Sequence, residues 1–209
     1  MNREFTTYTL PNGIRGIHRQ VKSNVAHCAL VINAGSRDEH PDEYGLAHFT
    51  EHAFFKGTQR RRAWQVNCRL ENLGGELNAF TTKEETTIHA TTLRGDFAKA
   101  VELIADVAFH STFPERELER EKEVIVDEIN TYKDSPVDMI YDTFEDMLFA
   151  GSELGHNILG RKNALARYDG EAIRAFTGRT HTTDQMVFSS IGNFSAKTAE
   201  AVAARYFAE

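Results

Sequence analysis

LAHFTEHAFFKG, residues 46–57, contains the most informative pattern in this sequence. Its composition predicts a helix, which we expect Asp42 to cap at the N-terminus and Gly57 to end. His48 and His52 are four residues apart, so both imidazoles project from one face of that helix. Glu51 follows His48 by three residues and points to the same side. The stretch therefore predicts a helix with one chemically distinctive face.

The residues before this helix predict β-structure. EFTTYTL (4–10) and IRGIHRQ (14–20) flank the turn-forming Pro11-Asn12-Gly13, which is typical of a β-hairpin. VAHCALVINAG (25–35) is mostly apolar and ends at a glycine, so we expect a strand buried on both faces. A polar loop then leads to residue 46.

The residues after the helix alternate between helical and strand patterns without a strict repeat. The Thr-rich stretch 76–93 predicts one long strand or two shorter strands, and residues 186–194 predict another. Helices are predicted over 63–75, 96–110, 115–134, 136–150, 164–180 (with an interruption at a glycine) and 195–209. This mixture indicates the α+β class.

Composition narrows the function. The 209 residues carry a formal net charge of −7, which argues against the basic face of a nucleic-acid-binding protein. No stretch reaches the length needed to cross a bilayer, so no membrane partner is expected. The N-terminal residues lack the pattern of a secretory signal, and the two cysteines, Cys28 and Cys68, predict no disulfide framework. We therefore expect a cytoplasmic protein.

The face of the helix at 46–57 has the residues of a metal site. Two histidines at this spacing suit tetrahedral zinc, and Glu51 is placed to act on a metal-bound water. The order His-x-x-Glu-His is that of inverzincin peptidases. The alternative is a surface helix with scattered His and Glu, so a third ligand is required. The remaining histidines lack a suitable partner and are expected to be ordinary surface or core residues: His18, His27, His40, His89, His110, His156 and His181.

The charged helix at 115–134 offers candidates for the third ligand. Glu117, Glu121 and Glu128 share a face by four- and seven-residue spacing, with Val124 between them. The run Val124–Val126 predicts that the helix becomes buried just before Glu128. A carboxylate at the end of an apolar run needs a partner, and a metal ion is one.

These features together resemble the pitrilysin family of zinc peptidases. The resemblance is carried by HFTEHAFFKGT (48–58) and extends in order over essentially the whole chain; Thr50 and Ala53 depart from the residues common in the family without removing a chemical group. It implies a mixed, largely antiparallel sheet packed with helices, in a single metal-bearing domain of residues 1–209. It also implies one zinc ion held by His48, His52 and Glu128, with 75 residues between the last two.

The resemblance assigns further roles. Glu121, seven residues before Glu128, would orient a ligating histidine by hydrogen bonding; the alternative is a surface ion pair with neighbours near Lys122. Zinc would lower the pKa of a water, and Glu51 would take its proton and pass it to the leaving amine. GGELNAFT (74–81) resembles the family's edge strand, so a peptide substrate is expected to pair with Asn78, Ala79, Phe80 and Thr81. Asn78 could also be an ordinary edge residue.

The resemblance also implies that something is missing. Family members usually carry paired domains of this size that enclose a chamber, and the second contributes an Arg/Tyr pair that this chain does not contain. A second domain, or a homo- or hetero-oligomeric partner, is therefore expected, with weak or absent activity for the chain alone.

Two other functions use related features. S-ribosylhomocysteine lyase uses the same motif with a Cys ligand, but neither Cys28 nor Cys68 lies at a suitable distance downstream. A non-catalytic scaffold or partner subunit is the other rival, and the intact motif favours catalysis over it.

Overall fold

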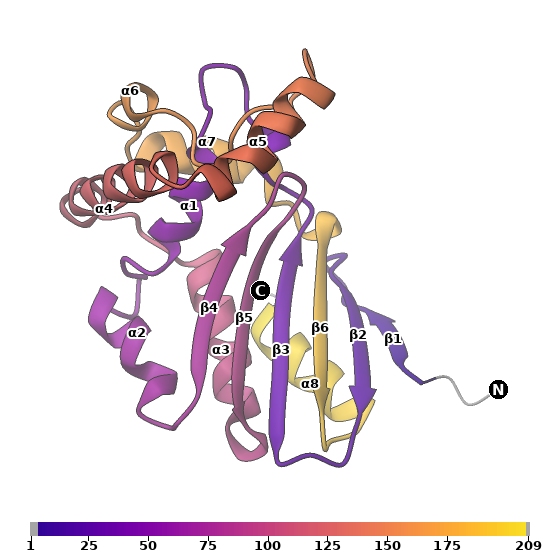
Figure 1. Ribbon diagram of the computed structural model, residues 1–209. Coiled ribbons are helices and arrows are strands. Elements are labelled where there is room, and N and C mark those ends of the chain that lie inside the picture. The colour runs from indigo at the N-terminus through magenta and orange to yellow at the C-terminus, as the bar shows by residue number, and fades with distance from the viewer. Residues whose placement is uncertain (1–3, 208–209) are drawn as a thin grey trace.

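The computed structural model describes residues 4–207 and consists of one mixed sheet with helices around it (Figure 1). The strand order is β1-β2-β6-β3-β5-β4. Every pairing is antiparallel except that of β2 with β6. The strands are β1 (Thr6–Thr9), β2 (Arg15–Gln20), β3 (Val25–Ile32), β4 (Glu76–Thr81), β5 (Thr86–Leu93) and β6 (Met186–Gly192). The expected α+β fold with a largely antiparallel sheet is confirmed.

The helices fall into two groups (Figure 1). One group covers one face of the sheet: α3 packs on β3 and β5, and α8 packs on β2 and α3. The other gathers at one end of the sheet and contains α1, α4, α5, α6 and α7, while α2 lies beside β4 and α3. The bounds are α1 (Leu46–Phe54), α2 (Ala63–Glu71), α3 (Phe97–Phe109), α4 (Glu115–Lys133), α5 (Pro136–Leu148), α6 (Lys162–Leu165), α7 (Gly170–Thr180) and α8 (Ala196–Phe207).

The two sheet faces differ in burial. In β3 the residues alternate, so that Ala26, Cys28, Leu30 and Ile32 are buried against the helices while His27 is exposed. The prediction that this strand is buried on both faces is therefore wrong. Its apolar run is continuous because small and β-branched residues also occupy the more open face, and composition alone does not distinguish the two cases.

Helix α1 begins at Leu46, as predicted, but it has a different cap and ends earlier than predicted. Its N-cap is Gly45, in the left-handed conformation with φ of 96°, and not Asp42. It ends at Phe54, three residues before Gly57, because the chain turns there into a short bridge between Gly57 and Arg62. Buried Phe49 and Phe54 anchor α1 in the core. This anchoring fixes which face of α1 turns toward α4.

The helical stretch at residues 164–180 also differs from the prediction. Residues 164–180 do not form one interrupted helix, because α6 ends at Leu165 and α7 starts anew at Gly170. Asp169 caps α7 by accepting hydrogen bonds from the backbone N–H groups of Glu171 and Ala172. In the described part of the chain, no helix is long and apolar enough to cross a membrane.

Candidate metal centre

Helix α1 presents His48 and His52 on the face that turns toward α4. Their ring centroids lie 4.6 Å apart, as expected for residues one turn apart. His48 is buried, and His52 is about one-fifth exposed in its side chain. The local geometry predicted from the spacing is therefore present.

Glu128 of α4 completes a cluster of three potential ligands. Its Oε2 atom lies 3.6 Å from Nε2 of His48 and 3.7 Å from Nε2 of His52. One ligand atom from each of the three residues lies within 4.8 Å of the others. The separations are too long for hydrogen bonds but close to the roughly 3.4 Å between ligands around tetrahedral zinc. Two imidazoles and a carboxylate are also a donor set that zinc favours, so the residues fit the ion.

The protonation of His48 suits a metal ligand. Burial, followed by the nearby charge of His52, lowers the pKa of His48 to about 3, so that the imidazole is neutral at physiological pH. Its Nδ1 atom is buried and has no hydrogen-bond partner among residues 4–207. Its Nε2 atom faces Glu128, so the neutral ring could offer the Nε2 lone pair to a metal ion without first losing a proton.

Glu121 fixes the orientation of His52. The Nδ1–H group of His52 donates to Oε1 of Glu121 at 2.7 Å, which leaves Nε2 facing the cluster. Burial is the largest single effect and opposes the charge on both side chains, but their mutual hydrogen bond and the neighbouring charges together outweigh it. As a result the pKa of His52 is raised, and the pKa of Glu121 is lowered with help from Lys56. The structure thus places Glu121 on His52 and not among surface residues near Lys122.

Lys56 is a residue of this centre that the sequence interpretation missed. Its Nζ lies 2.5 Å from Oε2 of Glu121, at the end of α1. It follows His52 by four residues, so helical spacing could have indicated it. Lys56 compensates the buried carboxylate, which in turn holds the imidazole.

Glu51 points to the region between α1 and β4. Burial raises its pKa, and Thr81 of β4 and His52 offset this only in part. A carboxylate with a raised pKa accepts and releases a proton more readily near neutral pH. Glu51 is not one of the three converging ligands. Its position fits a group that transfers protons beside the cluster.

Strand β4, next to α1, is an edge strand of the sheet. It pairs with β5 on one side, with Asn78 opposite His89 and Thr81 opposite Thr86. Among residues 4–207 no strand pairs with its other edge. The side chain of Asn78 accepts a hydrogen bond from the backbone N–H of Ala79 at 2.9 Å. The four residues Asn78, Ala79, Phe80 and Thr81 thus lie on the edge nearest the cluster.

The buried stripe of α4 differs from the predicted one. It consists of Leu118, Glu121, Ile125 and Ile129, whereas Val124 is 52% exposed. Glu117 pairs instead with Arg120 and takes no part in the cluster. Three consecutive residues of a helix point in different directions, so they cannot all face the protein core. An apolar run of this kind therefore does not show which face of the helix is buried.

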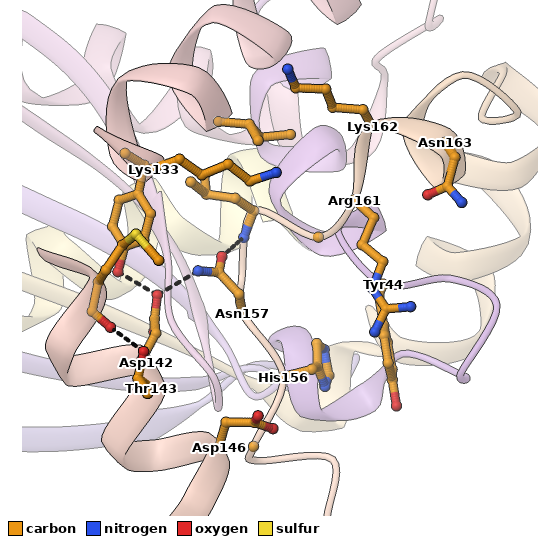
Figure 2. A pocket seen from close by; sticks show the side chains of 16 residues that line it. Tyr44, Lys133, Asp142, Thr143, Asp146, His156, Asn157, Arg161, Lys162 and Asn163 are labelled. Atoms are coloured by element: carbon orange, nitrogen blue, oxygen red, sulfur yellow. Dashed lines mark hydrogen bonds between the residues drawn. The ribbon is translucent and has the colours of Figure 1, made fainter. Parts of the chain in front are cut away.

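A separate cavity of about 700 Å³ lies between α4, α5 and the segment 155–163 (Figure 2). None of His48, His52 and Glu128 lines it. Figure 2 shows His156 and Tyr44 side by side at its wall, where their rings stack with centroids 3.8 Å apart. The cavity is therefore distinct from the cluster of potential ligands.

Comparison with known proteins agrees with the geometry. The sequence matches the family model of insulinase (peptidase family M16) over residues 17–162. It is 38% identical over 190 residues to the uncharacterized zinc protease YmxG of Bacillus subtilis. The aligned region covers 90% of this chain and 46% of that protein. The chain spans about half the length of the curated relatives it matches.

Solved structures share the fold. The periplasmic protease PqqL from Escherichia coli has a TM-score of 0.92 at 22% identity, with 100% of this chain and 24% of that chain covered. A structure described as the inactive domain of a peptidase M16 from Pseudomonas fluorescens has a TM-score of 0.90 at 20% identity, covering 99% of this chain and 50% of that chain. At these identities the likeness concerns the fold.

Proposed function

Since the chain belongs to the insulinase family, peptidase family M16, we propose that it is the metal-bearing part of a zinc metalloendopeptidase that hydrolyses peptides or unfolded polypeptide segments. The observation that supports this most directly is the convergence of His48, His52 and Glu128 within 4.8 Å. The zinc-protease names of relatives imply zinc as the metal. We propose one zinc ion per chain, held by these three residues.

In this proposal, bound zinc supplies a Lewis acid that makes a water molecule more acidic. Glu51 takes the proton of the attacking water and delivers it to the leaving nitrogen, which its raised pKa favours. Glu121 holds His52 with Nε2 toward the ion. The substrate adds as a strand to β4 along Asn78–Thr81, where main-chain hydrogen bonds give affinity with little demand on sequence.

We propose that residues 1–209 form one such domain and that a second domain or partner subunit completes the enzyme. The exposed surface of α5 supports this. Within residues 137–149, eight large apolar side chains are 38–75% exposed: Val137, Met139, Ile140, Tyr141, Phe144, Met147, Leu148 and Phe149. Apolar surfaces this concentrated mark interaction sites. The relatives, about twice as long, have a further half that is the natural candidate to cover it.

Polar contacts hold α5 to the rest of the chain, which leaves its apolar side free. The hydroxyl of Tyr132 donates to Asp142, as does the side-chain amide of Asn157. Lys83 pairs with Glu145 at 3.2 Å. The apolar residues of α5 therefore do not contribute to the core that α1 and α4 share, and a partner can bury them without rearranging the metal centre.

The test of the proposed chemistry is the variant Glu51→Gln. We expect it to retain one zinc ion per chain and to lose hydrolysis, measured in the presence of whatever second half gives the wild-type chain its activity. Glu128→Gln is the matched comparison and is expected to lose zinc as well. Unchanged hydrolysis by Glu51→Gln would refute the role of Glu51.

The alternative is a non-catalytic partner subunit in a peptidase assembly. Its support is the likeness in fold to a domain described as inactive. A zinc-free chain that binds its partner fully, together with unchanged assembly activity in Glu128→Gln, would favour this alternative.

A further inference from the structure

Helix α1 carries most of the proposed site but lacks a cap of its own. The N-cap residue of α1 is Gly45, which has no side chain that could accept a hydrogen bond. The first turn of α1 also contains no acidic residue. The first backbone N–H groups of a helix have no partner within the helix and need an acceptor from elsewhere. In this chain the acceptor comes from outside α1.

Glu39 supplies that acceptor. One carboxylate oxygen accepts from the backbone N–H of Gly45 at 3.0 Å, and the other accepts from the backbone N–H of Ala47 at 2.7 Å. Ala47 directly precedes His48 in the sequence. The carboxylate therefore fixes the turn from which the first proposed ligand projects, and its negative charge lies at the helix N-terminus, where it is favourable.

The side chain of Glu39 is completely buried. Burial raises its pKa, and the hydrogen bonds from His156, Ala47 and Gly45 oppose this. Burying a carboxylate is expensive unless all its acceptor positions are used. A capping side chain at position 45 itself is excluded, because the φ of Gly45 is 96° and a Cβ there would lie 2.8 Å from the backbone oxygen of Leu159. The carboxylate that caps α1 therefore comes from a different segment, and it can connect α1 to a third one.

That segment is the stretch that contains His156. Nε2 of His156 donates to Glu39 at 2.8 Å across 117 residues of sequence. The ring stacks on Tyr44, and the backbone carbonyl of His156 accepts from Lys83 at 2.7 Å. The same stretch crosses the start of α1 so closely that a Cβ on Gly160 would lie 2.2 Å from the backbone oxygen of Tyr44. Glu39 thus joins the start of α1 to the wall of the cavity in Figure 2.

We propose that Glu39 is a positioning residue for the metal centre, which acts through the first turn of α1 and is itself held by His156. The proposal rests on the zinc site of the preceding section. Glu39 touches neither the ion nor the substrate. It keeps the backbone at Ala47 and His48 in place, so that the imidazole of His48 lies close to the imidazole of His52 and the carboxylate of Glu128.

The test compares zinc affinity in Glu39→Gln and in Asp169→Ala, with the affinity measured by competition with a chromophoric chelator. In Glu39→Gln an NH2 group replaces one of the two carboxylate oxygens, and this group cannot accept from the backbone N–H that the oxygen served. We expect Glu39→Gln to bind zinc about tenfold more weakly, in the range known for residues that support metal ligands. Asp169→Ala removes the cap of α7, a helix that carries no proposed ligand, and should leave zinc affinity within twofold of wild type.

A spectroscopic reading separates positioning from general destabilisation. Visible absorption of bound Co²⁺ reports the geometry of its ligands. We expect the bands to change in Glu39→Gln and to stay as in wild type in Asp169→Ala, although both variants lower the thermal midpoint. Equal zinc affinity and equal Co²⁺ spectra in wild type and folded Glu39→Gln would overturn the proposal.

His156→Phe keeps the proposal testable if Glu39→Gln does not fold. Phenylalanine can retain the stacking on Tyr44 but cannot donate to Glu39. We expect zinc affinity about threefold weaker than in wild type, a smaller loss because the two bonds from Glu39 to α1 remain; affinity equal to wild type would overturn the proposal. If the wild-type chain itself binds no zinc, it is the proposed function that fails.

Discussion

The hydrogen bond between His52 and Glu121 has a measurable consequence at the scale of single residues. Glu121→Gln retains the shape of the side chain but weakens the acceptor for Nδ1–H of His52 and leaves Lys56 without its ion pair. We expect zinc affinity to fall about tenfold to a hundredfold, as is usual when a carboxylate behind a ligating histidine is lost. Chelator competition measures it.

Glu117→Gln is the matched control for that experiment. Glu117 lies on the same helix and pairs with Arg120 in an exposed i,i+3 contact. Its loss should leave zinc affinity unchanged. Equal losses in the two variants would contradict the specific role of Glu121.

His181 is expected to make the stability of the fold depend on pH. Its ring lies against Phe54 and Phe176, with centroids 6.0 and 5.9 Å away, and burial lowers its pKa to about 4. The unfolded chain has the ordinary value near 6.5. Between these values the unfolded state binds more protons, so stability is lost as pH falls from about 6.5 to 4 and is unaffected above that window.

Urea unfolding of wild type and His181→Phe over pH 4–8 measures this contribution. Relative to the variant, wild type should lose up to about 3 kcal/mol as pH falls to 4. The difference between the two should be constant above pH 7. Parallel curves over the whole range would show that His181 does not titrate as its burial implies.

The residues of the candidate centre that could be predicted are those whose arrangement follows from nearby sequence. His48, Glu51 and His52 lie on one turn of one helix, so their spacing alone predicts their shared face. The apolar run Val124–Val126 indicated Glu128 as a third ligand, whereas the role of Glu121 required the family resemblance. Glu39 was not found, since its contact with His156 spans 117 residues and no local pattern encodes it.

At the scale of helices and strands, the features that nearby sequence determines were likewise the ones predicted correctly. The hairpin of β1 and β2 was predicted correctly because Pro11-Asn12-Gly13 encodes its turn locally. The cap of α1 was wrongly predicted at Asp42, because the acceptor for its first backbone N–H groups comes from Glu39 through tertiary structure. The faces of β3 and α4 were misjudged because apolar composition does not reveal which neighbours are present.

Helix α5 allows a prediction about association. Phe144→Gln combined with Met147→Gln changes residues that are 61% and 75% exposed. Exposed substitutions of this kind usually change stability by no more than about 0.5 kcal/mol. We expect less self-association in analytical ultracentrifugation and weaker capture of the completing half, with an unchanged thermal midpoint.

Trp64→Gln is the control for α5. Trp64 is 62% exposed on α2, away from α5 in Figure 1. Its substitution should leave capture of the second half intact. If the α5 double variant bound that half as tightly as wild type, the proposed interface would be elsewhere.

At the scale of the whole molecule, the proposed need for a second half predicts the activity of the isolated chain. We expect the 209-residue chain to bind zinc yet hydrolyse peptides weakly or not at all. Adding the completing half should raise turnover, because it would enclose the substrate against β4 and exclude water. A fluorogenic peptide library measures turnover, and robust hydrolysis by a verified monomer would contradict the expectation.

The strand order has a consequence for synthesis on the ribosome. β6, which spans Met186–Gly192, lies between β2 and β3, so β2 has only β1 as a sheet neighbour until β6 has been made. β3, β4 and β5 can pair with one another far sooner, and α1 and α4 follow or accompany them. The nascent chain can therefore assemble the side of the sheet next to the candidate metal centre before β2 has paired with β6. Pairing of β2 with β6 is also slow, because a long stretch of sequence separates the two strands. The hairpin of β1 and β2 is translated before β3, β4 and β5, yet it is among the last parts of the sheet to be completed.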